Sequence, residues 1–176
     1  MLRARLRVPA EPLADLLGRT LLPAVAGLAI GFSSETQNPA IAERKSLMNQ
    51  DIVNVIKAYE KSLNASDTQA ALALYGSDPV FMPEFSAALS GRDAVKAGYD
   101  HVFSALKLNV SFTIHEIVQM GDLAYVRTTS EGNTEILQKK TTVREANNEL
   151  FIFRKEQGKW KIHRYLFASC KPPEVK

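Results

Sequence analysis

Titratable side chains alternate with aromatic residues in the last quarter of the chain. Glu149 has the same strand parity as Phe151, and His163 has the same parity as Tyr165 and Phe167. Because alternate residues of a β-strand point to one face, this face would combine aromatic rings with groups that carry protons. Such a mixture is typical of the wall of a small-molecule pocket. Burial there would raise the pKa of a carboxyl group, and a histidine near its ordinary pKa could act as a base.

Each of these groups also has a purely structural interpretation. Glu149 could form an ion pair at the end of a sheet, for example with Arg127 or Lys161. A single His163 on a strand could be a hydrogen-bonded structural residue. Tyr59, on the apolar side of a helical pattern, could be a core tyrosine or a hydrogen-bond donor in a pocket. The sequence leaves both interpretations open.

Other kinds of site have little support in the residue types. No pair of histidines has the spacing of metal ligands, and Cys170 is the only cysteine. We therefore expect neither a metal site nor an intrachain disulfide. No glycine-rich phosphate loop and no nucleophile elbow occurs, so we expect no cofactor.

The charge of the chain argues against a nucleic-acid partner. The formal net charge is +3, but six of the 22 basic and four of the 19 acidic residues lie in residues 1–47, which leaves 16 and 15 for the rest. A nucleic-acid-binding domain normally concentrates basic residues on one surface. The most basic run, residues 155–161, contains Glu156 and is typical of a solvated hairpin turn.

Residues 1–32 differ from the remainder in composition. Several arginines precede the apolar run 21–32, which is shorter than the roughly 20 residues that a membrane-spanning helix needs. Two interpretations stay open. The segment could be an export signal, or the domain could begin near Met48 and work in the cytoplasm, with 1–47 as an extension. Residues 33–47 are predicted to be a linker in either case, and no stable membrane span is expected.

From Met48 onward, Asn49 or Asp51 is the predicted cap at the start of a first helix. The apolar positions of this first helix are Ile52, Val55, Ile56, Tyr59 and Leu63. Asp67 is the predicted cap of a short second helix, and residues 76–79 are predicted to terminate this helix. A third helix is expected after Ser90 or Gly91, with its apolar positions at Val95, Tyr99, Val102, Phe103 and Leu106.

Strand patterns dominate the second half of the chain. Residues 80–85 form a short strand whose Pro83 favours an edge or a bulge, and a change of apolar parity near His115 predicts a bulge in the strand 108–117. The strand 123–131 follows, then a polar loop or strand edge over 139–148. The hairpin 149–167 closes the sheet, with three to five turn residues around Gly158. Helices first and antiparallel strands later indicate an α+β domain over residues 48–172.

One face of the closing hairpin is expected to pack against other elements, and the other to line a pocket. The packing face comprises Leu150, Ile152, Trp160, Ile162 and Leu166. The predicted pocket residues, besides Tyr59, Glu149 and His163, are Met82, Glu84, Tyr99, Phe103, Phe151, Tyr165 and Phe167.

Four stretches of the chain together carry a family resemblance. They are residues 55–67 (VIKAYEKSLNASD), 91–95 (GRDAV), 121–126 (GDLAYV) and 158–162 (GKWKI). In this order and spacing, the sequence is similar to the nuclear-transport-factor-2-like superfamily, and within it to SnoaL-like and steroid-delta-isomerase-like proteins. The resemblance covers about residues 48–170. It implies an α+β cone whose curved, mixed-edge sheet wraps around the helices and a central apolar pocket, often in a homodimer.

The resemblance also implies positions for catalytic groups. Steroid isomerases of this superfamily place a helix-1 tyrosine and a protonated strand aspartate in an oxyanion hole. The tyrosine matches Tyr59, and the protonated aspartate falls on or near Glu149. The general-base aspartate matches Pro83, which cannot accept a proton, and Glu84 stands next to it.

Two functions follow from these residues. The first is a small-molecule-binding SnoaL-like protein with an apolar pocket, a small apolar ligand and no nucleic-acid partner. The second is an isomerase, cyclase or hydratase that acts on an apolar ring or polyketide-like substrate by acid–base chemistry. In the second, Tyr59 and Glu149 would polarise a carbonyl group, and His163 or Glu84 would move the proton. A homodimer that forms through the sheet is expected with either.

Overall fold

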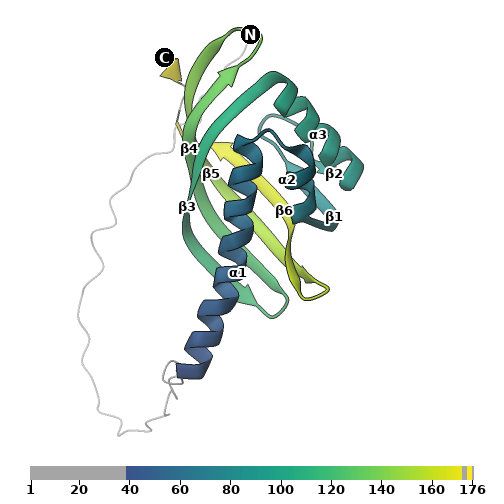
Figure 1. Cartoon of the computed structure of the whole chain (residues 1–176), viewed down its shortest axis with the longest axis vertical. Helices are drawn as coiled ribbons and strands as arrows, with labels where there is room; N and C mark the ends of the chain where they lie inside the picture. The colour runs from purple at the N-terminus through teal and green to yellow at the C-terminus, as the bar shows by residue number, and fades with distance from the viewer. Residues whose placement is uncertain (1–38, 172–173, 176) are drawn as a thin grey trace, which may run out of the picture. The chain divides into compact units, whose positions relative to one another are not determined.

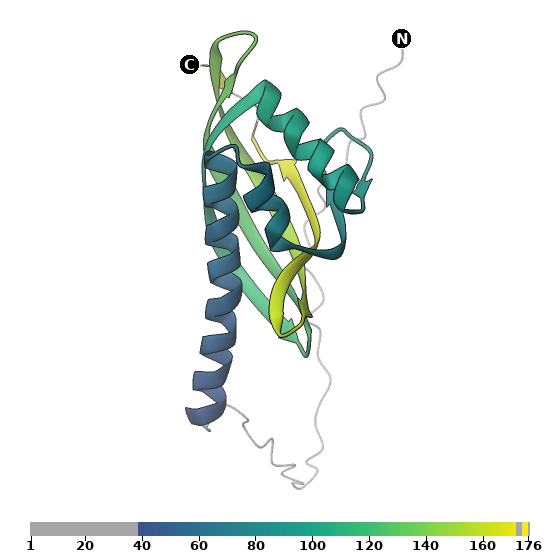
Figure 2. The ribbon, with the colours of Figure 1, turned by 45° about the vertical axis from the view of Figure 1, so that its right-hand side comes forward.

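Three helices cover one face of a curved sheet in the computed structural model, which describes residues 39–171 and 174–175 (Figures 1 and 2). The expected leader, residues 1–32, lies outside the described residues. The helices are α1 (Pro39–Asn64), α2 (Thr68–Leu74) and α3 (Arg92–Ala105). The predicted order of helices followed by strands is confirmed, and the fold class is α+β.

Helix α1 begins earlier than its apolar spacing suggests. Residues 39–47, which we predict as part of a linker, are helical. Proline is common at the first position of a helix, because that position needs no amide hydrogen for the helical ladder. The predicted apolar face of the helix is confirmed further along, where Ile52, Ile56 and Tyr59 are buried.

The two shorter helices begin where the capping residues predict. The Asp67 side chain accepts a hydrogen bond from the backbone amide of Ala70 at 2.9 Å, as an N-cap residue does. Gly91 precedes α3, and buried Val95 and Tyr99 turn that helix toward the sheet. Local sequence is enough to determine the start of α2, because the Asp67 cap bonds within its own turn. Gly91 makes no side-chain cap bond, and its amide donates to the distant carbonyl of Pro79.

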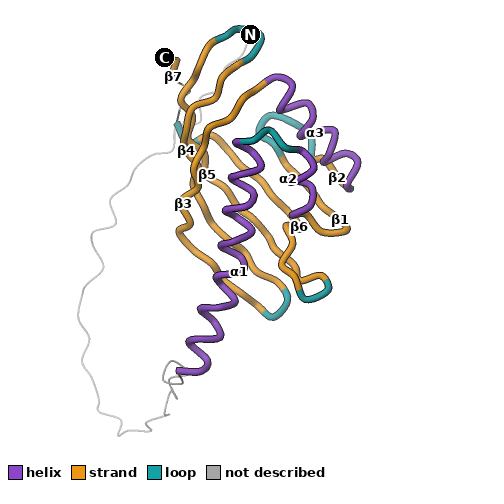
Figure 3. The backbone as a smooth tube through the Cα atoms, viewed as in Figure 1, coloured by secondary structure: helices purple, strands orange, loops and turns teal. Residues whose placement is uncertain are grey.

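The sheet has seven strands with one parallel pair. The strands are β1 (Tyr75–Met82), β2 (Leu89–Ser90), β3 (Leu106–Met120), β4 (Leu123–Ile136), β5 (Thr141–Glu156), β6 (Lys159–Ser169) and β7 (Glu174–Val175). Their order is β2-β1-β6-β5-β4-β3, and β7 pairs with β5 (Figure 3). Strand β1 runs parallel to β6, and every other pair is antiparallel. This arrangement confirms the predicted mixed edge of the sheet.

Strands β4 and β5 extend beyond the predicted segments. Residues 141–148, expected as polar loop or strand edge, pair with β4 in continuous register from Ile136↔Thr141 onward. Their polar composition misleads because backbone hydrogen bonds, rather than apolar side chains, hold this part of the ladder. The closing hairpin turns over only two residues, Gln157 and Gly158, which both have positive φ (51° and 76°), as a type I′ turn requires.

Two bulges determine which side chains of the long strands face the helices. The first lies at His115, where the register shifts between Ile114 and Glu116, and it confirms the predicted bulge. The second lies at His163, because Arg164 pairs with Ile152 while Ile162 pairs with Phe153. An extra residue reverses the alternation beyond it.

The second bulge corrects the predicted faces of the hairpin. Trp160 and Ile162 lie on the inner face together with Tyr165, and all three are buried, whereas Leu166 is 38% exposed on the outer face. On β5, the partly buried Leu150 and Ile152 likewise lie on the outer face, opposite the buried Phe151 and Phe153. The predicted packing face is therefore wrong for three of its five residues: Leu150, Ile152 and Leu166.

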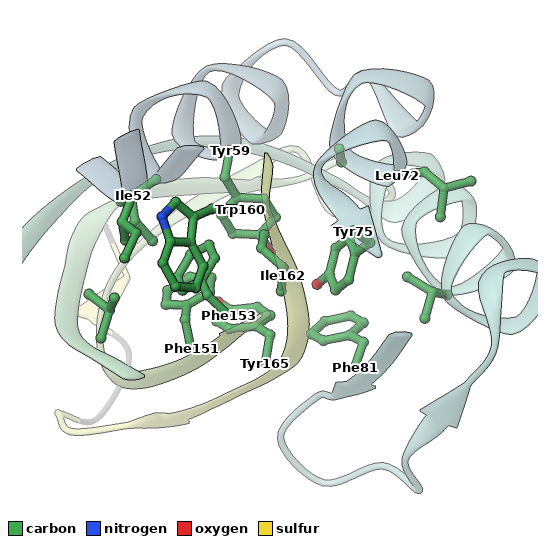
Figure 4. Close-up of a cluster of buried hydrophobic side chains, with 14 of the residues drawn as sticks. Ile52, Tyr59, Leu72, Tyr75, Phe81, Phe151, Phe153, Trp160, Ile162 and Tyr165 are labelled. Carbon is green, nitrogen blue, oxygen red and sulfur yellow. The ribbon is translucent and has the colours of Figure 1, made fainter. Parts of the chain in front are cut away.

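The core lies between the helices and the inner face of the sheet and is rich in aromatic rings (Figure 4). Phe151 stacks on Tyr165 with ring centroids 4.3 Å apart, and Tyr59 of α1 meets both rings edge-on at 5.5 and 5.4 Å. Offset stacked and edge-to-face arrangements are the favoured contacts of aromatic side chains. Among the described residues, no helix is both long and apolar enough to span a membrane.

Candidate functional site

A cavity of about 410 Å³ opens between the helices and the inner face of the sheet. Most of its wall is apolar: Leu63, Phe81, Pro83, Phe85, Val102, Leu106, Leu108, Val110, Phe112 and Phe167. Its polar wall comprises Tyr59, Glu84, Tyr99, Ser130, Glu145, Asn147, Glu149, Tyr165 and Ser169. The volume is within the usual range for a small-molecule site.

Glu149 lies in this wall and is only 4% exposed. Its carboxyl group accepts hydrogen bonds from the hydroxyl groups of Ser130 at 2.5 Å and Thr128 at 3.1 Å. Both donors lie on the neighbouring strand β4 and face the same side as Glu149. The ion pair that was the alternative for Glu149 does not form, since Arg127 pairs with Glu116 and Lys161 donates to the carbonyl of Ala73.

Burial raises the pKa of Glu149 to about 7, because the surrounding core disfavours the charged form. Hydrogen bonds from Ser130, Thr128 and Tyr165 act in the opposite direction and limit the rise. A carboxyl group with a pKa near neutrality can donate as well as accept a proton at physiological pH.

Three tyrosines, two from helices and one from the start of strand β1, form a chain of hydroxyl groups beside Glu149. The Tyr99 hydroxyl of α3 lies 2.6 Å from that of Tyr59 on α1 and 2.7 Å from that of Tyr75, which follows α2. All three side chains are buried, and burial raises the pKa of each well above its ordinary value. The three hydroxyls therefore keep their protons.

The three protons of this chain fix the direction of its hydrogen bonds. Three neutral hydroxyls carry three protons, and the two bonds between them use two. Tyr59 and Tyr99 line the cavity, whereas Tyr75 does not. If Tyr75 donates to Tyr99 and Tyr99 donates to Tyr59, the proton of Tyr59 is directed to the hydroxyl of Tyr165, which also lines the cavity.

Tyr165 connects the hydroxyl chain to the carboxyl group. Its ring meets Tyr59 edge-on with centroids 5.4 Å apart, and its hydroxyl donates a hydrogen bond to Glu149. We call this group of five side chains, Tyr59, Tyr75, Tyr99, Tyr165 and Glu149, the buried end of the site. It brings hydroxyl and carboxyl oxygens from two helices, α1 and α3, and three strands, β1, β5 and β6, to one side of an apolar cavity.

The opposite side of the site, which we call the open end, is more accessible. It comprises Glu84, Phe85, Glu145, Asn147 and Ser169. Strand β1 ends at Met82, so the alternation that would separate Pro83 from Glu84 no longer applies, and both residues line the cavity. Glu84 accepts a hydrogen bond from the Ser169 hydroxyl. Phe85 has a φ of 59° and is 97% exposed.

The structure brings together most of the residues predicted for the site. Tyr59 and Glu149 meet at the cavity, and Glu84, Tyr99, Tyr165 and Phe167 line it as well.

His163 is not among the lining residues, because the bulge turns it away from Tyr165. Its Nδ1 accepts a hydrogen bond from Arg164 at 3.0 Å, and burial, together with nearby arginines, lowers the pKa of His163. The expected convergence of His163 with Tyr59 and Glu149 is therefore wrong.

Three predicted pocket residues lie elsewhere. Met82 pairs with Leu166 on β6, and its neighbour Phe81 faces the cavity in its place. Phe103 packs beside Tyr99 outside the lining, and Phe151 is fully buried beneath Tyr165. Alternation along β1 turns Phe81 inward and Met82 to the opposite face.

Sequence reasoning missed several polar lining residues. Ser130 lies within the predicted strand 123–131, Glu145 and Asn147 lie on the extended part of β5, and Ser169 ends β6. Glu145 and Asn147 have the same parity as Glu149, so a longer predicted strand would have placed them on its face. No pattern in the sequence places Tyr75 in the site, because only tertiary packing brings its hydroxyl to that of Tyr99.

Comparison with known proteins agrees with this architecture. A family profile for the SnoaL-like domain matches residues 55–163. A ketosteroid isomerase-like protein from Erwinia carotovora atroseptica is 31% identical, with a TM-score of 0.66 over 69% of this chain and 95% of that chain. No curated protein matches the chain.

Two more distant structures show the same fold. One is an NTF2-like protein with a cystatin-like fold from Novosphingobium aromaticivorans, 18% identical, with a TM-score of 0.60 over 79% of this chain and 92% of that one. The other is a type 2 hexachlorocyclohexane dehydrochlorinase, 7% identical, with a TM-score of 0.65 over 75% of this chain and 90% of that one. The chain belongs to the SnoaL-like domain family, and it shares its fold with NTF2-like proteins.

Proposed function

We propose that this protein binds a small, largely apolar molecule in the cavity, with an oxygen of that molecule held between Tyr59 and Glu149. The observation that carries the proposal is the buried end, where the protonated hydroxyls of Tyr59 and Tyr165 line the cavity beside a carboxyl group of raised pKa. Most of the remaining wall is apolar, so a ligand gains free energy from burial of its hydrocarbon surface. The polar groups then set its orientation.

Two substitutions test the binding of the oxygen. Tyr59→Phe and Glu149→Gln keep the shape of the cavity and remove or alter one polar group each. We expect each to weaken binding of a ligand co-purified from the natural host, identified by native mass spectrometry, by about threefold to tenfold, the effect of one hydrogen bond. Calorimetric titration measures the affinity.

The matched control is Tyr125→Phe. The Tyr125 hydroxyl donates to Glu116 on the outer face of the sheet, 3.1 Å away and remote from the cavity. This variant should bind like the wild type. Unchanged binding by both cavity variants would contradict the proposal.

A second candidate function is acid–base catalysis of the isomerase, cyclase or hydratase type. The presence of two carboxyl groups in different surroundings favours it. Glu84 at the open end could take a proton from a carbon next to a carbonyl group, while Tyr59 and protonated Glu149 hydrogen-bond to the oxygen that gains charge. Return of the proton to another carbon would complete an isomerisation without a cofactor.

Proton exchange distinguishes catalysis from binding alone. A ketone ligand incubated with the protein in D₂O should gain deuterium at the carbon next to its carbonyl, followed by NMR. Glu84→Gln should abolish the exchange and leave binding in place. If the wild-type protein binds the ketone but exchanges no proton, binding alone is the function.

We also propose that the outer face of the sheet pairs with a second copy of this chain. A row of apolar residues crosses this face through the registers Val118↔Tyr125 and Tyr125↔Ile152, and Leu166 beside it is 38% exposed. Sedimentation velocity at micromolar concentration should show a dimer. Leu166→Glu should shift it toward the monomer, and a monomeric wild type would contradict this part of the proposal.

A further inference from the structure

The charged groups that line the cavity all have one sign. Glu84, Glu145 and Glu149 are in its wall, and among the described lining residues there is no lysine, arginine or histidine. A cavity that takes a carboxylate or a phosphate normally offers a cation or a cluster of amide groups to it. The wall of this cavity instead offers carboxyl oxygens to a ligand that donates hydrogen bonds or carries positive charge.

These carboxyl groups follow one strand. Glu145, Asn147 and Glu149 are alternate residues of β5 and face the cavity together, so their Cα atoms lie about 7 Å apart in sequence order. Glu84 joins them from the loop after β1, because it is bonded to Ser169, which pairs with Asn147 across the sheet. The open end therefore places two carboxyl groups, Glu84 and Glu145, around one amide.

The cavity glutamates differ in their partners from several glutamates outside the cavity. Three glutamates outside the cavity wall, Glu116, Glu131 and Glu156, each pair with an arginine. Glu145 accepts from the hydroxyl of Thr134 at 3.1 Å, and Glu84 and Glu149 are likewise bonded to hydroxyl groups. Hydroxyl groups satisfy the lone pairs of a carboxylate but leave its charge uncompensated.

A metal ion does not fit this arrangement. The described residues contain no group of three or more His, Cys, Asp or Glu side chains that could hold one. A cationic group on an organic ligand fits better, because it can approach Glu84 and Glu145 while its hydrocarbon part lies against the apolar wall. Attraction between opposite charges is stronger next to an apolar surface than in bulk water.

We infer that the cavity selects an apolar ligand that carries a positively charged amine, held by Glu84 and Glu145 at the open end. This inference rests on the proposed function, ligand binding in the cavity, and names the chemical class of the ligand. A neutral hydroxyl on the same hydrocarbon would be accepted less well, and a carboxylate would be rejected by repulsion.

Three probes with one bicyclic skeleton test the inference: naphthylmethylamine, naphthalenemethanol and naphthoate. Calorimetric titration of the full chain at neutral pH and low salt should give the amine at least about tenfold higher affinity than the alcohol, and naphthoate the lowest affinity. The preference for the amine should shrink as salt is added, since salt screens charge. These results would support the inference.

Substitutions test whether the preference for the amine over the alcohol comes from the open end of the cavity. Glu84→Gln and Glu145→Gln keep the size of each side chain, and each should reduce the ratio of amine to alcohol affinity by about threefold or more. The double variant should bring the ratio close to one. Glu131→Gln, whose carboxylate faces away from the cavity toward Arg144, is the matched control and should leave the ratio unchanged.

The possible failures are distinguishable. If none of the three probes binds the wild-type chain, the proposed ligand-binding function fails and the inference fails with it. If all three bind with equal affinity, or if naphthoate binds best, ligand binding stands and the inference is overturned. An amine preference that survives the double variant would also overturn the assignment to Glu84 and Glu145.

Discussion

The two ends of the cavity place the same residue type in different surroundings. At the buried end, Glu149 is enclosed by hydroxyl groups and aromatic rings, and burial raises its pKa to about 7. At the open end, Glu84 and Glu145 are only partly buried. The comparison indicates that burial, rather than residue type, decides what a carboxyl group can do. The buried carboxyl group can keep its proton, whereas the partly exposed carboxyl groups can meet a cation.

Removal of one aromatic ring from each end should give the largest contrast in the free energy of unfolding. Phe151 is fully buried beneath Tyr165, and Phe151→Ala should lower the free energy of unfolding by about 3–5 kcal/mol, because it leaves a cavity in the core. Phe85 is almost fully exposed, so Phe85→Ala should change it by less than about 0.5 kcal/mol. Urea denaturation measures both values, and a large effect at Phe85 would remove the contrast.

The pH dependence of stability should report the buried end. The folded-state pKa of Glu149 is raised from 4.5 to about 7, so folding favours its protonated form. The stabilisation from Glu149 is thus fully present below about pH 4.5 and is lost as pH rises through 7. The loss should reach about 3 kcal/mol, since each pKa unit is worth about 1.4 kcal/mol.

The Glu149→Gln variant is the control for this pH effect. It cannot titrate at this position, so its stability measured by denaturation at pH 5 and pH 8 should differ less than that of the wild type. Equal pH slopes in the two proteins would show that Glu149 titrates normally.

Interruption of the hydroxyl chain should have an intermediate effect. Tyr99→Phe keeps the ring that stacks on Phe81 at 5.1 Å but leaves the hydroxyls of Tyr59 and Tyr75 without their shared partner. Loss of partners for buried polar groups should lower the free energy of unfolding by about 1–3 kcal/mol. Thermal unfolding monitored by circular dichroism provides the measurement, and Tyr125→Phe should remain close to the wild type.

The smallest effects on stability are expected at the open end. Glu84→Gln and Glu145→Gln should each change the free energy of unfolding by less than about 0.5 kcal/mol, since both groups are only partly buried and form no ion pair. Chemical denaturation would detect a larger loss. Such a loss would mean that these carboxyl groups hold the fold together rather than face a ligand.

Much of the fold could be predicted because it depends on local patterns. The cap at Asp67 and the apolar face of α1 involve contacts within one or a few turns. The bulge at His115 was visible because the apolar parity changes between Ile114 and Ile117. The bulge at His163 produces a similar change, from Ile162 to Tyr165, but Leu166 continues the earlier parity and conceals it.

The site itself was only partly predictable. The parity of β5 places Glu149 with its neighbours on the inner face, and the pattern of α1 places Tyr59 there, so both residues could be proposed from the sequence. The face assigned to His163 was wrong because one extra residue in a strand reverses all later positions. Glu145 was missed because it belongs to a polar stretch whose strand pairing depends on backbone hydrogen bonds.

The sequence by itself therefore determined the helices, most of the strands, the apolar residues of the core and the family of the fold. Tertiary structure alone decided which polar groups meet. Tyr59 and Tyr99 come from helices α1 and α3 and Tyr75 from the start of strand β1, and their hydroxyls converge only because the helices pack on the inner face of the sheet. The raised pKa of Glu149 has the same origin, since desolvation depends on the surrounding elements rather than on neighbours in the chain.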